Sequence, residues 1–257
     1  MSTDGLRLAI GTLTRIPVPP PRTVDRRSAR AAMLLAPVVG LVLALVVGVA
    51  AQVLVARTPT PGLLGAALAL TALTWLTRAL HLDGLADTAD ALGSGRPAAD
   101  SLAIARASDI GPFGVVALLL ALLVQAAALG HLLDTGAGAG ALVIAIVVGR
   151  LAMTLACTPT FPAARADGLG ATVSGTVPAW AAWLTAIGWL ALFAGAVGRA
   201  HGPVASAATG LAVAAGIVAA LALGRTAVRR LGGITGDVLG AMNELAVTVV
   251  LVVLVVV

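Results

Sequence analysis

The sequence has no lysine and no tyrosine, and charged side chains of either sign are sparse. Only 11% of its 257 residues are charged and 60% are hydrophobic, and all sixteen basic residues are arginine. A soluble domain carries about 25% charged residues. The composition therefore excludes an ordinary soluble protein and indicates an integral membrane protein.

Cysteine is nearly absent as well. The single Cys157 excludes an internal disulfide, and because it lies in an apolar run we expect it only to pack. Residues 1–31 lack the apolar core of a secretory signal and are instead rich in arginine and proline. A short amphipathic helix at the membrane interface is expected over residues 4–13, before Pro17 breaks it.

Long apolar stretches dominate the rest of the chain, and each reaches the ~17–25 residues that cross a bilayer. They are residues 32–56, 62–80, 112–133, 139–157, 178–198, 203–223 and 238–257. The sequence thus predicts an all-α, polytopic protein with about seven transmembrane helices. We expect residues 1–257 to form one membrane-embedded domain, with a basic N-terminal segment over 1–31 and a polar, Asp-rich segment over 81–111.

The arginines are unevenly distributed between the two sides of the seven spans. Twelve fall in segments on the same side as the N-terminus, and only Arg57 and Arg199 fall in segments on the other side. The positive-inside rule then predicts a cytoplasmic N-terminus in the cell (inner) membrane, with every polar motif facing the cytoplasm. The same rule accounts for the net charge of +5 without any nucleic-acid partner.

Residues 81–95 carry the densest group of acids. Asp83, Asp87 and Asp90 are three of eleven acids in the chain and are spaced i, i+4, i+7. On a helix they fall within roughly 60° of one another. Because three carboxylates on one face repel each other, a cation such as Mg²⁺ or Mn²⁺ is expected there. The alternative is a solvated acidic surface.

Two arginine motifs suggest phosphate binding. In the motif Arg106–Gly114, Arg106 is a phosphate-binding candidate and Asp109 a metal ligand or general base; the alternatives are a positive-inside anchor and a helix-capping residue. Arg150 lies inside the span 139–157, where a charge costs about 2.5–3.5 kcal/mol. A phosphate, an aspartate or a cavity is expected beside Arg150, with snorkelling to the interface as the alternative.

Two more motifs precede the fifth and seventh spans. Arg165–Gly170, with Ser174, has the glycine-rich, basic character of a phosphate-accommodating loop, although an ordinary turn has the same composition. Asp237 and Glu244 lie seven residues apart on one face of the last span. We expect both to reach the membrane depth of the aspartate cluster; the alternative for Glu244, the only glutamate, is a buried structural acid.

Five stretches taken together resemble the cobalamin synthase family, the adenosylcobinamide-GDP ribazoletransferases. They are Leu13–Pro19, His81–Asp90, Ser108–Gly114, Arg165–Gly170 and Leu231–Asp237. The resemblance implies a membrane phosphotransferase that joins adenosylcobinamide-GDP to α-ribazole or its 5′-phosphate. It would yield adenosylcobalamin or its 5′-phosphate and GMP, with Mg²⁺, in a late step of cobalamin nucleotide-loop assembly. Arg78 and Ala79 depart from the family, which often has glycines there.

The motifs and the resemblance together define the expected site. We expect Asp109 and Asp237 to be catalytic. The expected ligands of Mg²⁺, or of Mn²⁺ in its place, are Asp83, Asp87, Asp90 and Glu244. The expected substrate-binding residues are Arg15, His81, Arg106, Arg150, Arg165 and Ser174.

Two other functions fit parts of the sequence. The acidic motif is similar to that of CDP-alcohol phosphotransferases of phospholipid synthesis, but Thr88-Ala89 stands where those enzymes have Ala-Arg. An ion-coupled transporter would also carry acids in its spans, although here the acids are predicted at one membrane face. The expected partners are the two substrates and the lipid bilayer, with a homo-oligomer as an open expectation.

The predicted topology can be tested by cysteine labelling in a background where Cys157 is replaced by alanine. New cysteines at Gly95 and Gly170 should react with an impermeant thiol reagent only from the cytoplasm. Cysteines at Thr135 and His201 should react from outside. Labelling of position 95 from outside would overturn the site assignment, because a nucleotide substrate is cytoplasmic.

Overall fold

The computed structural model describes residues 3–106 and 109–257; Ala107 and Ser108 of the Arg106–Gly114 motif lie outside them. The helices are α1 (Thr3–Leu13), α2 (Arg26–Arg57), α3 (Gly62–Leu76), α4 (Leu80–Gly93), α5 (Ala98–Ile104), α6 (Pro112–Asp134), α7 (Gly138–Ala156), α8 (Gly168–Val173), α9 (Ala179–His201), α10 (Pro203–Leu231) and α11 (Gly236–Val256). Among the described residues, β pairing is limited to one isolated bridge, Ala163–Ile234. The all-α prediction is confirmed.

Within residues 3–106 and 109–257, six helices are long and apolar enough to cross a membrane, namely α2, α6, α7, α9, α10 and α11. The pair α3 and α4 becomes a seventh span if its bend is included. The predicted spans lie close to these helices, although α10 continues to Leu231, past the predicted end at 223. The predicted amphipathic helix is present as α1, whose Gly5 packs against Ala31 of α2.

The predicted span 62–80 is interrupted by a bend near its end. Helix α3 stops at Leu76, and α4 starts at Leu80 with its axis bent by 90°. Arg78 and Ala79 both have a φ of 56°, in the left-handed region, and these two residues turn the chain. For residues with a side chain this conformation costs roughly 1–2 kcal/mol each.

The N-terminal segment supports this turn. The Arg78 guanidinium donates hydrogen bonds to the Gly11 and Thr12 carbonyls at the end of α1, at 2.7 and 3.1 Å. In return, the Arg15 N–H donates to the Leu76 carbonyl at the end of α3, at 2.8 Å. The carbonyls at the end of a helix have no partner within the helix. Here those at the end of α1 are satisfied by Arg78, which follows α3, and the one at the end of α3 is satisfied by Arg15, which follows α1.

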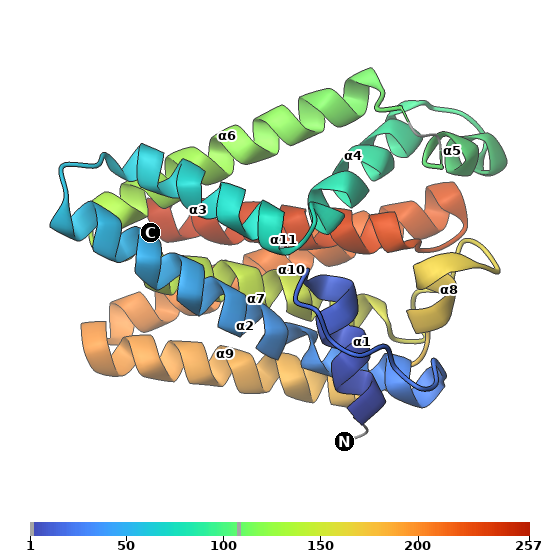
Figure 1. Ribbon diagram of the computed structural model, residues 1–257, viewed down its shortest axis with the longest axis horizontal. Helices are drawn as coiled ribbons and strands as arrows, with labels where there is room; N and C mark the ends of the chain where they lie inside the picture. Colours follow the sequence, from blue (N-terminus) through green and yellow to red (C-terminus); the bar gives the residue numbers. More distant parts are fainter. Residues whose placement is uncertain (1–2, 107–108) are drawn as a thin grey trace.

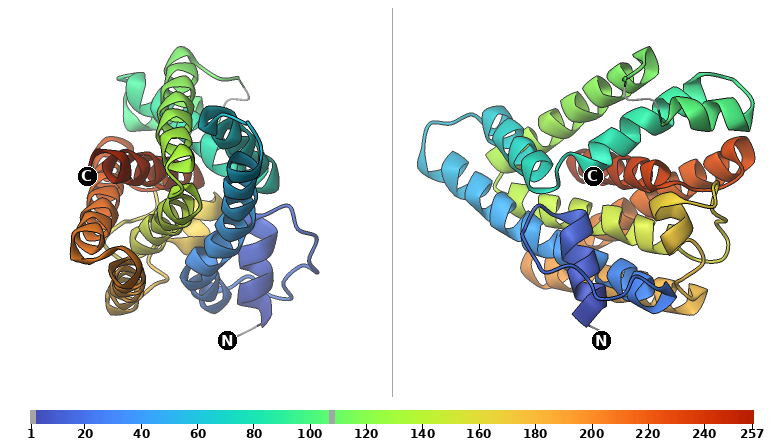
Figure 2. Two further views of the ribbon diagram at one scale, coloured as in Figure 1. Left: turned by 90° about the vertical axis from the view of Figure 1, so that its left-hand side faces the viewer. Right: turned by 45° about the vertical axis from the view of Figure 1, so that its right-hand side comes forward.

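The helices form a bundle with α7 at its centre (Figure 1, and Figure 2, left). In the most apolar 18-residue stretch of α7, 83% is buried inside the bundle, against 17% for the corresponding stretch of α9. Helix α9 therefore lies on the outside of the bundle. The end of the bundle at the right of Figure 1, here called the α5–α8 end, holds α5, α8 and the start of α11. Helix α2 also begins at this end, where Ser28 N–H bonds to Asp25 and lowers the pKa of that carboxyl.

Helices α4 and α11 cross in backbone contact. A Cβ at Gly84 would lie 2.7 Å from the Asp237 carbonyl oxygen, and a Cβ at Gly240 would lie 3.1 Å from the His81 carbonyl oxygen. At Gly84 a real Cβ would force the helix axes apart, and at Gly240 it would require a smaller shift of the neighbouring backbone. The crossing brings the acidic face of α4 to the first turn of α11.

Replacing Gly84 with alanine should therefore separate the two helices. We expect a loss of about 1–3 kcal/mol, as for other overpacked cores, seen as a lower midpoint of thermal unfolding in detergent. Gly188→Ala on α9 is the control, since its Cβ would meet nothing within 4 Å. Equal unfolding midpoints for the two variants would contradict the tight crossing.

Candidate active site

A cavity of about 510 Å³ lies between α4, α6 and the segment after α5. It is lined by Ala79, Leu82, Asp83, Ala86, Asp87, Ala105, Arg106, Asp109, Ile110, Leu118 and Leu122. We call it the carboxylate cavity. It gathers four of the residues that the sequence predicts for the site, Asp83, Asp87, Arg106 and Asp109.

Two of the three carboxylates of α4, Asp83 and Asp87, are free to bind a ligand. Asp83 is exposed and Asp87 half-buried, and neither side chain has a hydrogen-bond or ion-pair partner among residues 3–106 and 109–257. The backbone of Asp237 packs against Gly84, which lies between Asp83 and Asp87 in the sequence, so the first turn of α11 contacts this part of α4. Carboxylates this close to one another attract a cation.

The donor set fits a Mg²⁺ ion that is shared with a substrate. Within the described parts of the chain, no three His, Cys, Asp or Glu side chains converge as a complete metal site. Mg²⁺ is usually held by one or two carboxylates together with waters and substrate phosphates, so a protein cage is not required. Asp83 and Asp87, on successive turns of α4, supply such a pair.

Asp90 and Glu244 are engaged elsewhere. Asp90 is 6% exposed, and its carboxylate accepts the N–H groups of Gly111 at 2.7 Å and Gly114 at 2.9 Å, which ties α4 to the start of α6. Glu244 accepts from the amides of Gln125 and Asn243, each at 3.0 Å, and lies in a separate cluster. Their roles as metal ligands stay predictions.

The predicted arginines of the two polar loops form ion pairs. Arg106 Nη2 contacts both carboxylate oxygens of Asp167, at 2.6 and 2.7 Å, and links the segment after α5 to the start of α8. Arg165 Nη2 lies 3.4 Å from Asp237 Oδ2, which also accepts from the Thr235 hydroxyl. Arg165 Nη1 is buried without a hydrogen-bond partner in the described structure.

Two predicted substrate residues have structural contacts. Arg15 stacks on Trp75, with its guanidinium carbon 3.9 Å from the ring centroid. The Ser174 hydroxyl donates to the Phe161 carbonyl at 2.7 Å. Neither residue lines the carboxylate cavity. Their roles in substrate binding stay predictions.

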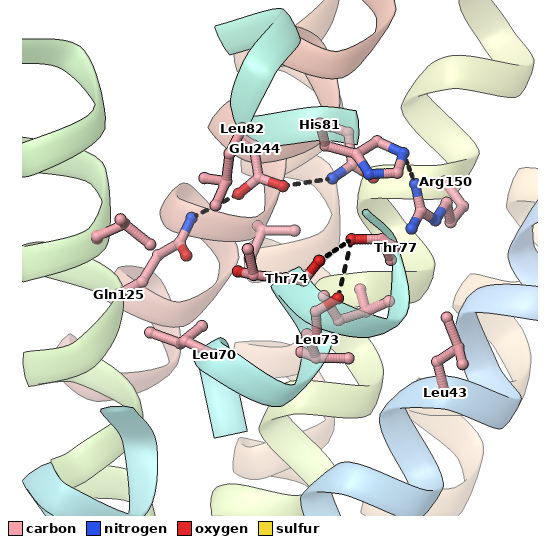
Figure 3. Close-up of a pocket in the computed structure, with 14 residues that line it drawn as sticks. Leu43, Leu70, Leu73, Thr74, Thr77, His81, Leu82, Gln125, Arg150 and Glu244 are labelled. Carbon is pink, nitrogen blue, oxygen red and sulfur yellow. Dashed lines mark hydrogen bonds between the residues drawn. The ribbon is translucent and has the colours of Figure 1, made fainter. Parts of the chain in front are cut away.

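A second cavity lies deeper in the bundle and is shown in Figure 3. This deep polar cavity is lined by Leu43, Leu70, Leu73, Thr74, Thr77, His81, Leu82, Leu122, Gln125, Ile146, Arg150, Asn243, Glu244 and Val247. Leu82 and Leu122 line both cavities and therefore form the wall between them.

Arg150 projects into the deep polar cavity and is only 2% exposed, so it has a cavity around it and does not snorkel. Its Nη1 donates to His81 Nε2. Because a guanidinium only donates, His81 Nε2 is the acceptor in this contact. Gly40 of α2 makes the room, since a Cβ there would lie 2.8 Å from Arg150 Cγ.

Gln125 and Asn243 belong to none of the sequence motifs that predict the site. Both are about as buried as Arg150, at 1% and 2% exposed, and both donate to Glu244. Asn243 is the only asparagine in the chain, and Gln125 is one of two glutamines. Amides within apolar spans were the available signal, because a polar group inside a membrane needs a partner.

The chain matches the family described as cobalamin-5-phosphate synthase over residues 5–255. A relative from Nocardioides sp. named adenosylcobinamide-GDP ribazoletransferase is 46% identical over 250 residues, covering 96% of this chain and 96% of the relative. Relatives of the same name from Frankia casuarinae and Syntrophobacter fumaroxidans are 41% and 39% identical, covering 96% and 94% of this chain and 93% of each relative.

No solved structure matches the chain. The resemblance carried by the sequence motifs is confirmed by a family match that includes both helices of the α4–α11 crossing and every predicted site residue. The chain is a transferase, itself a membrane protein, and belongs to the cobalamin-5-phosphate synthase family.

Proposed function

We propose that this protein joins adenosylcobinamide-GDP to α-ribazole, or to α-ribazole 5′-phosphate, and releases GMP. The relatives that span the same length carry the name of this activity. The observation that carries the proposal is the α4–α11 crossing, which brings Asp83 and Asp87 beside Asp237 at the edge of a cavity. Phosphoryl transfer needs this kind of site, because it depends on charge neutralisation and positioning more than on covalent catalysis.

The proposed reaction exchanges a phosphoanhydride bond for a phosphate ester bond. The ribose 3′-oxygen of α-ribazole forms a bond to the phosphorus on the cobinamide side of the pyrophosphate. The bond from that phosphorus to the bridging oxygen breaks, and the bridging oxygen leaves as part of GMP. The proton of the 3′-hydroxyl passes to a carboxylate of the enzyme.

Two aspartates are candidates for that proton. Asp109 lines the carboxylate cavity from the segment between α5 and α6. Asp237 has one oxygen that accepts from Thr235 and Arg165, which hold it in a fixed orientation. We propose Asp109 as the general base and Asp237 as the residue that orients Arg165 toward the leaving phosphate, because Arg165 Nη1 has no partner in the described structure.

The proposed cofactor is Mg²⁺, with Mn²⁺ as a substitute. Asp83 and Asp87 would hold it, and the bound ion would neutralise charge on the pyrophosphate. In support, both side chains are without other partners in the parts of the chain that the structure describes. The paired Arg106 and Asp167 would close the cavity on the side of α8.

The proposed location is the cell membrane, with the α5–α8 end in the cytoplasm, where nucleotide-linked substrates are found. The support is the arginine distribution, since Arg96, Arg106, Arg165, Arg229 and Arg230 all belong to segments at this end. A phospholipid-type reaction would instead require a CDP-linked donor, so comparing CDP- and GDP-linked donors separates that alternative.

Charge removal on α4 tests the proposed function. Asp83→Asn and Asp87→Asn keep the side-chain size but remove one carboxylate each, so each should abolish Mg²⁺-dependent GMP release from adenosylcobinamide-GDP and α-ribazole. Each should also weaken Mn²⁺ binding, measured by electron paramagnetic resonance, by at least the ~10–100-fold that loss of a group orienting a metal ligand costs.

The matched control is Asp100→Asn in α5, an exposed acid outside both cavities. It should retain activity and Mn²⁺ binding. Full activity of Asp83→Asn at both saturating and limiting Mg²⁺ would show that this helix face is only a solvated acidic surface.

A further inference from the structure

A further cavity, of about 320 Å³, lies where α4 ends and α6 begins, at the upper right of Figure 1. We call it the Arg96 cavity, and its lining includes Asp90, Ser94, Arg96, Asp109, Gly111 and Phe113. Its volume falls at the lower end of the range for small-molecule sites, so it suits a group of nucleoside size and not a corrin ring. Because Asp109 also lines the carboxylate cavity, the two cavities are neighbours.

The wall of the Arg96 cavity on the side of α6 is fixed by Asp90. Its carboxylate accepts the N–H groups of Gly111 and Gly114, which flank Phe113. The Phe113 ring also lies against the end of α4, since a Cβ at Gly93 would lie 2.8 Å from Phe113 Cδ1. Even so, Phe113 is 51% exposed. An aromatic ring that lines a cavity and stays half exposed offers a surface on which a planar base can stack.

Arg96 brings an unpaired cation to this cavity. Its backbone is held by two serines, since its N–H donates to Ser94 Oγ at 3.3 Å and its carbonyl accepts from the Ser101 hydroxyl at 3.1 Å. Its guanidinium has no hydrogen-bond or ion-pair partner among residues 3–106 and 109–257, whereas Arg106 and Arg165 are paired with aspartates. A free guanidinium on a held loop is suited to a phosphate, because its planar fork matches two phosphate oxygens.

The three groups Phe113, Asp109 and Arg96 match the three parts of α-ribazole 5′-phosphate. Phe113 would stack on the planar base and Arg96 would bind the 5′-phosphate. The 3′-hydroxyl that attacks belongs to the ribose between them and would reach Asp109, which lines both cavities.

The GMP part of the donor has similar chemistry but fits this cavity less well. Its only phosphate belongs to the pyrophosphate, which the proposed reaction places beside the aspartates of α4. Arg96 does not line the carboxylate cavity. The phosphate that Arg96 would bind is therefore one that takes no part in the reaction, and of the two substrates only the phosphorylated acceptor carries such a group.

We propose that the Arg96 cavity binds the acceptor, and that Arg96 selects α-ribazole 5′-phosphate over α-ribazole by binding the 5′-phosphate. Arg96 is then a specificity-determining residue, and Phe113 binds the base that both acceptors share. The inference rests on the proposed function, because it concerns the acceptor of that reaction.

The selectivity is tested by isothermal titration calorimetry of the full-length protein in detergent, with each acceptor alone. Wild type should bind α-ribazole 5′-phosphate about tenfold more tightly than α-ribazole, as expected for one hydrogen-bonded charge pair. Arg96→Gln should lose this preference and keep its affinity for α-ribazole. The substitution removes no side-chain hydrogen bond or ion pair of the described structure, so the variant should fold.

Two further variants complete the test. Arg22→Gln is the matched control, because Arg22 is an exposed arginine of the N-terminal segment and lines none of the three cavities. It should keep the tenfold preference. Phe113→Leu keeps an apolar side chain but removes the ring, so it should weaken the binding of both acceptors equally, by about tenfold.

Equal affinity of wild type for the two acceptors, or a preference that survives in Arg96→Gln, would overturn the selectivity. Unchanged affinity for both acceptors in Phe113→Leu would overturn the placement of the base.

GMP release by wild type separates these failures from failure of the proposed function. Wild type that releases GMP but shows no Arg96-dependent preference contradicts this inference alone. Wild type that shows the preference but releases no GMP contradicts the proposed reaction alone. Wild type that binds neither acceptor and releases no GMP contradicts both.

Discussion

The backbone contact between α4 and α11 is the constraint on which the rest of the site depends. Gly84 and Gly240 let the two helices touch, and this contact brings Asp237 next to the aspartates of α4. The carboxylates on the two helices repel each other, and this repulsion disfavours the contact between α4 and α11 until a cation is bound. Packing therefore stabilises an arrangement that the charges alone would separate.

The contact in turn requires that the second span be broken. A straight helix through residues 62–93 could not both pair with α2 and cross α11, and the left-handed pair Arg78 and Ala79 supplies the 90° bend. The end of α1 stabilises that bend through the Arg78 side chain. The N-terminal segment, which the sequence predicts as an interfacial helix, is thus part of the scaffold of the site.

Much of this organisation could be predicted from the sequence, because hydropathy marks the spans and i, i+4 spacing marks the acidic face of α4. The bend could not, since neither Arg78 nor Ala79 is a residue type that favours a left-handed turn. The separation of Glu244 from the aspartates follows from helix geometry, because seven residues rise by about 10 Å. The Arg106–Asp167 pair joins two loops, which no local pattern reveals.

The central claim is that the aspartates at the crossing hold a cation against the pyrophosphate of the donor. The most direct measurement is electron–nuclear double resonance on Mn²⁺ bound to the wild-type protein with adenosylcobinamide-GDP. Phosphorus hyperfine coupling to protein-bound Mn²⁺, lost in Asp87→Asn, is the result this account predicts. Mn²⁺ that binds without phosphorus coupling, or that keeps the coupling in Asp87→Asn, would contradict it.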